Sequence, residues 1–271
     1  MNQVIQDYRD STGADARATF DVPSQGQTYL NSAGKPSGVS RYSRLVPFNK
    51  LTLASAATTV AQMYTNLFEF IHSGTGTEVV ALSDDGGVNY KSQSTTPADG
   101  DNVLITPVAT ATQFYAKLTA SAQWRLDMQV SINTVATLFA SFGFDENITD
   151  PDPTGTAGEG ARFLFDPTRE VTTGLTAAQH LNWILAHKVN GADTFTATSI
   201  PVTAGQDYEL TIAVGIDLKA KFYIDGVYVG IGPALTSGDT VAVFSGLELT
   251  ATPDGQQDMD IRYVCLSRAI G

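Results

Sequence analysis

The sequence predicts an all-β fold, a two-sheet antiparallel sandwich preceded by an extended N-terminal arm. Short segments alternate apolar and polar residues, turn-forming residues separate them, and helical patterns long enough to form crossovers between parallel strands are missing. Hydrophobic residues make up 42% of the chain and charged residues only 16%, a balance typical of strands with neutral polar faces. A chain of 271 residues is long enough for one large sandwich.

The first 50 residues predict the arm, and residues 51–271 the sandwich. Few positions in the arm are apolar, and it shows neither helical nor strand periodicity. It holds six basic and four acidic residues, for a net charge of +2, so the rest of the chain carries −14. The opposite charges favour docking of the arm onto a neighbour. An arm that stays ordered needs such contacts, because ordering costs about 1–2 kcal/mol of backbone entropy per residue. A solvated tail is the alternative. The candidate partner-binding residues are Arg9, Arg17, Arg41 and Arg44.

The strand signal strengthens along the chain. Leu53–Leu67 is ambiguous, because its apolar residues fall on one helical face while it contains β-branched residues that favour a strand. Strands dominate from Phe68 onward, and the clearest covers Gln123–Ile132, where five apolar side chains alternate with polar ones. Further strands are expected over 137–144, 161–166, 183–189 and 240–250.

The C-terminal third predicts a hairpin and a final strand. Alternation runs from Tyr208 to Val214 and again up to Ile224, where Asp225-Gly226 is the dipeptide that suits a two-residue type I′ turn. The last strand, 259–267, is expected to point Met259, Ile261, Tyr263 and Cys265 inward. Cys265 is then a small core hydrophobe rather than a nucleophile. Burying so many antiparallel strands without helices is simplest in two packed sheets.

The order of these segments resembles a known family. The landmarks are ALSDDGGVNYKSQ, TPADGDNVLI, QWRLDMQVSI, FASFGFDEN, GARFLFDP, LNWILAHKVNG, QDYELTIAV, KFYIDGVYVG and MDIRYVCLSR. Together they resemble the concanavalin A-like jelly-roll domains encoded among bacteriophage structural genes, over about residues 75–271. The resemblance implies a sandwich of the legume-lectin and laminin G type, used as a capsid decoration, head-fibre or tail-fibre module. An arm before a sandwich resembles proteins that clamp onto a capsid shell, often as trimers.

Catalytic patterns are weak, so the sequence predicts a protein that is not an enzyme. Sandwich glycosidases place two carboxylates about 5–5.5 Å apart for a retaining mechanism, usually on one strand. The chain has no Glu-x-Asp-x-x-Glu motif, and Glu146 and Asp150 precede two prolines that predict a loop. A Gly-x-Ser-x-Gly nucleophile elbow is missing as well.

Metal and cofactor sites are not expected either. An acidic loop could supply oxygen ligands to Ca²⁺, but its spacing matches no calcium loop and its prolines restrict it, so a solvated turn is the simpler interpretation. Its residues are Asp145, Glu146, Asn147, Asp150 and Asp152. The histidines, His72, His180 and His187, are far apart in sequence and have no cysteine partner for a zinc site.

Three aromatic residues are candidates for a binding surface. Trp183, Tyr223 and Tyr228 could stack on sugar rings, although a core or subunit-contact role is the more ordinary use of such residues.

Charge and hydropathy limit the partners. The net charge of −12 argues against nucleic acid as a partner. The sequence contains neither an 18-residue apolar run that could span a membrane nor a signal-peptide pattern. One cysteine cannot form an internal disulfide, so burial or neighbouring chains must hold the fold. The resemblance to phage proteins implies a virion protein made in a bacterial cytoplasm. We expect a capsid decoration (cement) or head-fibre protein that binds the major capsid protein or another virion protein and forms a homo-oligomer, a trimer by the resemblance. The alternative is a tail-fibre or receptor-binding module that recognises a host surface glycan.

Overall fold

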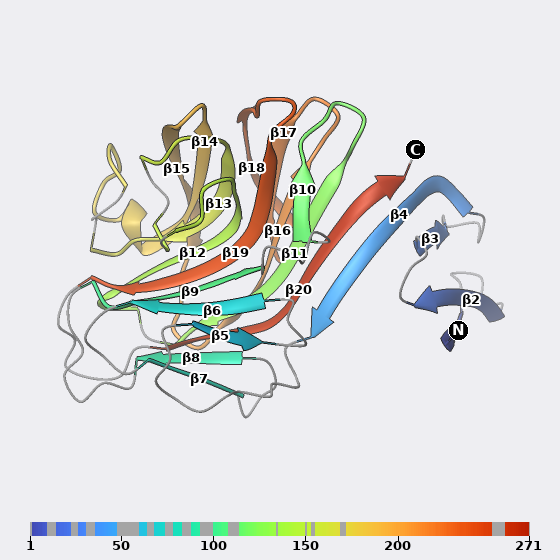
Figure 1. Ribbon diagram of the computed structural model, residues 1–271, viewed down its shortest axis with the longest axis horizontal. Helices are drawn as coiled ribbons and strands as arrows, with labels where there is room; N and C mark the ends of the chain where they lie inside the picture. The colour runs from blue at the N-terminus through green and yellow to red at the C-terminus, as the bar shows by residue number, and fades with distance from the viewer. Residues whose placement is uncertain are drawn as a thin grey trace.

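The computed structural model is almost entirely β, as the sequence predicts, with two antiparallel sheets packed face to face (Figure 1). It describes residues 2–9, 15–22, 27–30, 36–47, 60–63, 68–73, 78–82, 88–92, 100–107, 114–133, 135–149, 151–152, 155–168, 172–250 and 258–270. No helix among these residues is long and apolar enough to cross a membrane.

Within the described residues the first sheet has nine strands, in the order β15-β14-β13-β12-β19-β9-β6-β5 with β10 paired to β19. Its strands are β5 (Val60–Met63), β6 (Phe68–Ser73), β9 (Asn102–Pro107), β10 (Tyr115–Lys117), β12 (Leu138–Asp145), β13 (Gly160–Phe165), β14 (Asn182–Val189), β15 (Ala192–Pro201) and β19 (Thr240–Leu249). The short 3-10 helix η2 (Gln179–Leu181) precedes β14 and lies outside this sheet (Figure 1).

The described part of the second sheet also has nine strands, in the order β18-β17-β16-β11-β20-β4-β3 with β8 paired to β20 and β7 to β8. Its strands are β3 (Gln27–Leu30), β4 (Pro36–Pro47), β7 (Glu78–Leu82), β8 (Val88–Ser92), β11 (Trp124–Ile132), β16 (Asp207–Val214), β17 (Lys219–Ile224), β18 (Val227–Ala234) and β20 (Asp258–Ile270).

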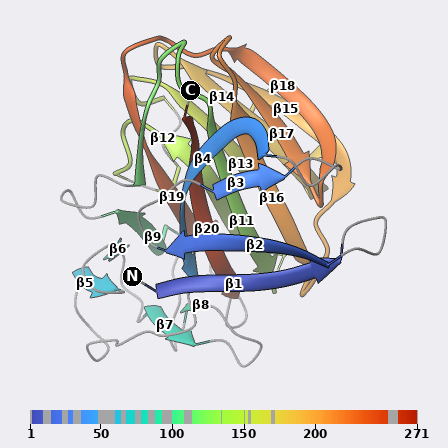
Figure 2. The same ribbon diagram turned by 90° about the vertical axis from the view of Figure 1, so that its right-hand side faces the viewer.

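The N-terminal residues contain strands of their own. Strands β1 (Asn2–Arg9) and β2 (Asp15–Val22) form a separate two-stranded sheet, at the side of the molecule that carries β3 and β4 (Figures 1 and 2). Strand β4 pairs along β20, from Ser40 opposite Ile270 to Pro47 opposite Tyr263. The division of the chain at residue 50 stays a prediction, but the backbone of β4 belongs to the second sheet. Of the ambiguous segment Leu53–Leu67, the structure describes residues 60–63, which are strand.

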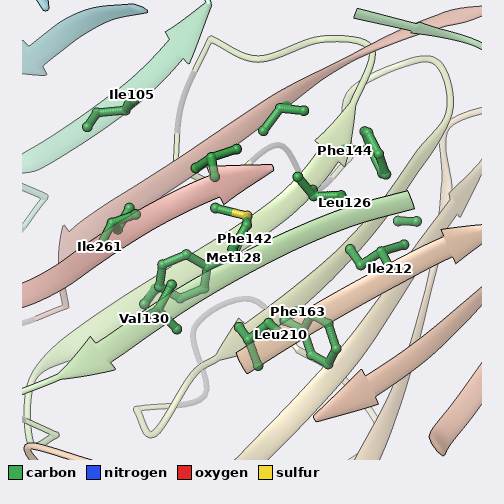
Figure 3. Close-up of a cluster of buried hydrophobic side chains, with 14 of the residues drawn as sticks. Ile105, Leu126, Met128, Val130, Phe142, Phe144, Phe163, Leu210, Ile212 and Ile261 are labelled. Carbon is green, nitrogen blue, oxygen red and sulfur yellow. The ribbon is translucent and has the colours of Figure 1, made fainter. Parts of the chain in front are cut away.

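The core lies between the two sheets, as alternation predicts (Figure 3). Strand β11 buries Leu126, Met128, Val130 and Ile132, while Trp124 at its start is only partly buried. The first sheet contributes large aromatic side chains from its central strands. These include Phe142, Phe144, Phe163, Phe165 and Trp183.

The final strand differs from the prediction because of a bulge. In the pairing of β11 with β20, Val130 lies opposite Ile261 but Gln129 lies opposite Tyr263, so Arg262 is an extra residue. A bulge of one residue exchanges the two faces of a strand. Met259 and Ile261 are buried as expected, but beyond the bulge Val264 and Leu266 enter the core. The prediction that Tyr263 and Cys265 point into the core is therefore wrong.

Two glycines let the edge strand β18 approach the first sheet. A Cβ atom on Gly230 would lie 2.5 Å from Cδ1 of Leu185, and one on Gly232 would overlap the ring of His187. Both partners belong to β14, a strand of the opposite sheet. The absence of side chains at Gly230 and Gly232 thus allows the sandwich to narrow at this edge.

Candidate functional site

A pair of tyrosines marks the outer face of the second sheet. Asp225 (φ 51°) and Gly226 (φ 76°) form the tight turn between β17 and β18, as predicted. The turn places Tyr223 directly opposite Tyr228, and their rings meet edge to face with centroids 5.7 Å apart. Tyr228 is 53% exposed. We call Tyr223 and Tyr228 the tyrosine platform.

Trp183 does not join this platform. Its ring is fully buried among Phe142, Phe163 and Tyr208, with centroid distances of 5.9, 6.2 and 5.4 Å. Because it packs inside the sandwich, it cannot stack on a ligand. Of the two alternatives for Trp183, the structure supports the core role.

A polar row continues the platform across the sheet. Register places Thr211 of β16 opposite Tyr223, and Asp127 of β11 opposite Thr211. The Thr211 hydroxyl donates to Oδ1 of Asp127 (2.5 Å), and Nε of Arg125 donates to both Asp127 oxygens (2.8 and 2.9 Å). Adjacent strands lie about 4.8 Å apart, so the row from Tyr228 to Asp127 extends roughly 14 Å. Sequence reasoning missed this row, because cross-strand register cannot be read from one strand.

Cys265 ends this row. It lies opposite Asp127 on β20 and is partly buried. Burial, and then the carboxylate of Asp127, raise the pKa of the Cys265 thiol to about 11. Burial also raises the pKa of Tyr263 to about 12, with a further contribution from Glu209. A thiol that is held neutral is a poor nucleophile, in agreement with an unreactive role for Cys265.

The acidic loop begins at Asp145, the last residue of β12, which contacts two buried cations. Asp145 is fully buried, with Oδ1 2.6 Å from Nζ of Lys188 and Oδ2 3.5 Å from Nη1 of Arg162. Arg162 also contacts Asp193 at 2.6 Å. Burial raises the pKa of Asp145, while Arg162 and Lys188 oppose that rise. Asp145 and Asp193 together therefore balance the charges of Lys188 and Arg162, and the expectation of a solvated turn is wrong for Asp145.

Hydrogen bonds hold the rest of that loop over the first sheet. Lys188 donates to Oγ1 of Thr156 (2.6 Å), Gly155 donates to Asp193 (2.8 Å), and the Ser141 hydroxyl donates to the Pro151 carbonyl. Asp150 lies outside the described residues. Among the residues that are described, no group of three or more His, Cys, Asp or Glu could hold a metal ion.

Glu159 anchors three loops. Its buried carboxylate accepts hydrogen bonds from the backbone of Asn190 (2.7 Å) and from both the backbone and the hydroxyl of Thr236 (2.9 and 2.8 Å), while its own N–H donates to Glu146 (3.1 Å). Because buried charge is stable only when it is hydrogen-bonded, this residue is structural. It was not predicted, since its partners lie up to 77 residues away.

The two histidines whose side chains are described, His180 and His187, make contacts with different residues. Nδ1 of buried His180 lies 2.9 Å from the Asp166 carbonyl, which accepts a hydrogen bond, and 3.0 Å from the Thr172 hydroxyl. His187 packs against Phe222, and burial, with a smaller effect from Arg162, lowers its pKa to about 4. The side chain of His72, in β6, lies outside the description.

The arginines proposed to bind a partner lie on the N-terminal strands. Arg9 is in β1 and Arg17 in β2, and register places each opposite an aspartate, Asp15 and Asp7. Arg41 and Arg44 are in β4, opposite Ala269 and Leu266 of β20. Their side chains lie outside the described residues, so their role stays a prediction.

Comparison with known proteins supports the fold. No protein-family model and no curated protein sequence matches the chain. Among solved structures, a Bacillus licheniformis β-glucanase is similar over 84% of this chain and 98% of its own, with 11% identity and a TM-score of 0.51. A GH16 protein of Bacteroides ovatus, in complex with a glucan product, covers 82% and 98%, with 9% identity and a TM-score of 0.53.

The fold is a concanavalin A-like jelly roll. A Shewanella oneidensis protein of unknown function also shares it, over 90% of this chain and 91% of its own, with 11% identity and a TM-score of 0.53. Since glycoside hydrolases occur among these structures, the prediction that the chain is not an enzyme is wrong as an exclusion. At such low identity the likeness shows the fold alone.

Proposed function

We propose that this protein is a carbohydrate-binding module whose binding surface is the tyrosine platform. The observation that carries the proposal is the turn-fixed pair of half-buried Tyr223 and exposed Tyr228 on the outer face of a sheet. The C–H face of a pyranose packs on an aromatic face, and a ring that is preordered by a tight turn loses little entropy on binding. Both glycoside hydrolases that share the fold are carbohydrate-active proteins, which supports this class of ligand.

The polar row supplies what a sugar requires beyond stacking. Asp127 and Arg125 present hydrogen-bonding groups on the same face, with side chains 16% and 43% exposed, while the buried Thr211 hydroxyl holds Asp127 in place. Sites that combine an apolar surface with a few oriented polar groups are typical of small-ligand recognition.

Binding to a glycan array, followed by calorimetry on the oligosaccharides retained, tests the proposal. Tyr228→Ala should weaken binding roughly tenfold, while Tyr228→Phe, which keeps the ring, should bind nearly as well as the native chain. Tyr228→Phe should unfold like the native protein, and Tyr228→Ala should lose only the ring contact with Tyr223, about 1 kcal/mol, because Tyr228 is half exposed. Reducing-end release, measured on the same oligosaccharides, would reveal hydrolysis. Equal binding by the native chain and Tyr228→Ala would refute the platform.

A contact with another protein subunit is a second candidate for the same surface. Ile231, which lies opposite Lys221 on the same face, is 46% exposed, and exposed apolar groups beside tyrosines are typical of interfaces. This candidate predicts that Tyr228→Ala lowers the molecular mass measured by light scattering and leaves no glycan signal to lose.

The virion role is the finer part of our proposal. We infer from the phage-like order of segments and the charge opposition that the protein is a decoration, head-fibre or tail-fibre component, attached through residues 1–50 to the capsid or another virion protein. A fibre with a carbohydrate-binding face would present that face to a host surface glycan.

A further inference from the structure

The two sides of the tyrosine platform differ in charge. On one side lies a row in which Ile231, Lys221, Ala213 and Arg125 follow each other across β18, β17, β16 and β11. On the other side lies Glu209, which is exposed and sits opposite Gln129. A ligand on the platform therefore meets cations along one edge and a carboxylate along the other.

We call the row from Ile231 to Arg125 the cationic edge, and it has a small side chain at its centre. Ala213 is the smallest side chain in its row, and it lies directly between Lys221 and Arg125. These residues are two strand spacings apart, roughly 10 Å between backbones, so their long side chains can both reach a group placed above Ala213.

The charge of this edge is not neutralised by the described residues. Lys221 forms no hydrogen bond or ion pair with any of them through its side chain, and it is partly buried rather than fully solvated. The nearby Asp127 is occupied by Arg125, whose Nη2 lies 2.7 Å from Oδ1. The ammonium of Lys221 is therefore the charge on this edge that no described carboxylate contacts, in a chain whose net charge is −12.

We propose that the platform selects acidic sugars, with the ring stacked on the tyrosines and its carboxylate above Ala213, between Lys221 and Arg125. This proposal rests on the carbohydrate-binding function proposed above. Charge-assisted hydrogen bonds from an ammonium and a guanidinium to one carboxylate are stronger than neutral ones. The hydroxyl groups on the far side of the ring can donate to Glu209, which fixes the orientation of the sugar.

Matched ligand pairs distinguish the acidic-sugar inference from the carbohydrate-binding function on which it rests. The full chain is titrated with oligogalacturonate and with oligosialate, each compared with its methyl ester, which keeps the ring and the length but removes the charge. We expect at least one acid form to bind roughly tenfold more tightly than its ester, and the difference to shrink as salt is raised.

Variants assign the effect to the cationic edge. Lys221→Met should remove most of the preference for the acid form while leaving affinity for the ester unchanged, and Lys117→Met, an exposed lysine on β10 of the other sheet, should change neither. Equal binding of acid and ester by the native chain, with loss of both in Tyr228→Ala, would overturn the acidic-sugar inference and keep the platform. Absence of binding to every acidic and neutral glycan tested would overturn both.

Discussion

At the scale of single residues, His187 has its chemistry set by the core around it. Its ring lies between Phe222 and Gly232, where burial favours the neutral form. A histidine whose pKa falls to about 4 on folding contributes stability above its unfolded pKa of about 6.5, and this contribution is lost as pH falls toward 4.

His187→Gln tests this linkage. Between pH 7.5 and pH 5 the native protein should lose about 2 kcal/mol of unfolding free energy through this residue, because the unfolded chain takes up a proton that the folded chain refuses. The variant should lack that loss, so the difference between the two proteins should narrow on acidification. Urea denaturation at both pH values measures it. Parallel changes in the two proteins would show that His187 does not titrate as proposed.

Residue-level prediction from the sequence succeeded where the signal was local. The Asp225-Gly226 turn was identified because the positive φ angles that it requires depend on the identity of two adjacent residues. The Lys221, Ala213 and Arg125 row could not be found, since its members come together only through the register of three strands. Arg162 and Lys188 were missed because nothing in their own segments indicates a buried partner.

At the scale of elements, the edge strand β18 depends on residues without side chains. Gly232→Ala places a methyl group into the His187 ring, so β18 must move away from β14 or the ring must leave its position against Phe222. Overpacking of this kind costs about 1–3 kcal/mol, and we expect the upper part of that range because both sheets are involved.

Gly226→Ala is the matched comparison. Nothing lies within 4 Å of a Cβ there, so its cost comes only from the positive φ of 76°, about 1 kcal/mol. Thermal or urea unfolding should therefore rank native above Gly226→Ala above Gly232→Ala. The reverse order would mean that β18 does not pack closely on β14.

Most of the expected strands lie where the pattern of apolar residues placed them, and the prediction failed where a bulge interrupts a strand. Strands β11, β12, β13, β14, β16, β17 and β19 lie where periodicity predicts them. The bulge at Arg262 defeated the same reasoning in β20, because a period of two carries no information about an inserted residue. Strand β15 was not expected, since its exposed threonine-rich sequence lacks a strong apolar stripe.

At the scale of the whole molecule, the attachment proposal can be tested without dismantling the sandwich. Removing residues 1–50 would also remove β4, so deletion of residues 1–35 is the better truncation. The shortened chain should keep a native-like unfolding transition but fail to appear on purified particles, because it lacks Arg9 and Arg17. Quantitative mass spectrometry relative to the major shell protein measures occupancy. Full occupancy by the truncated chain would rule out attachment through this segment.

The position of β20 has a consequence for how the protein is made. Strand β20 lies between β11 and β4 inside the second sheet, not at its border. During translation β11 therefore has an unpaired edge until β20, more than 120 residues later, has left the ribosome. A premature stop codon shortly before Asp258 would thus leave the second sheet without one of its inner strands and expose two strand edges to aggregation.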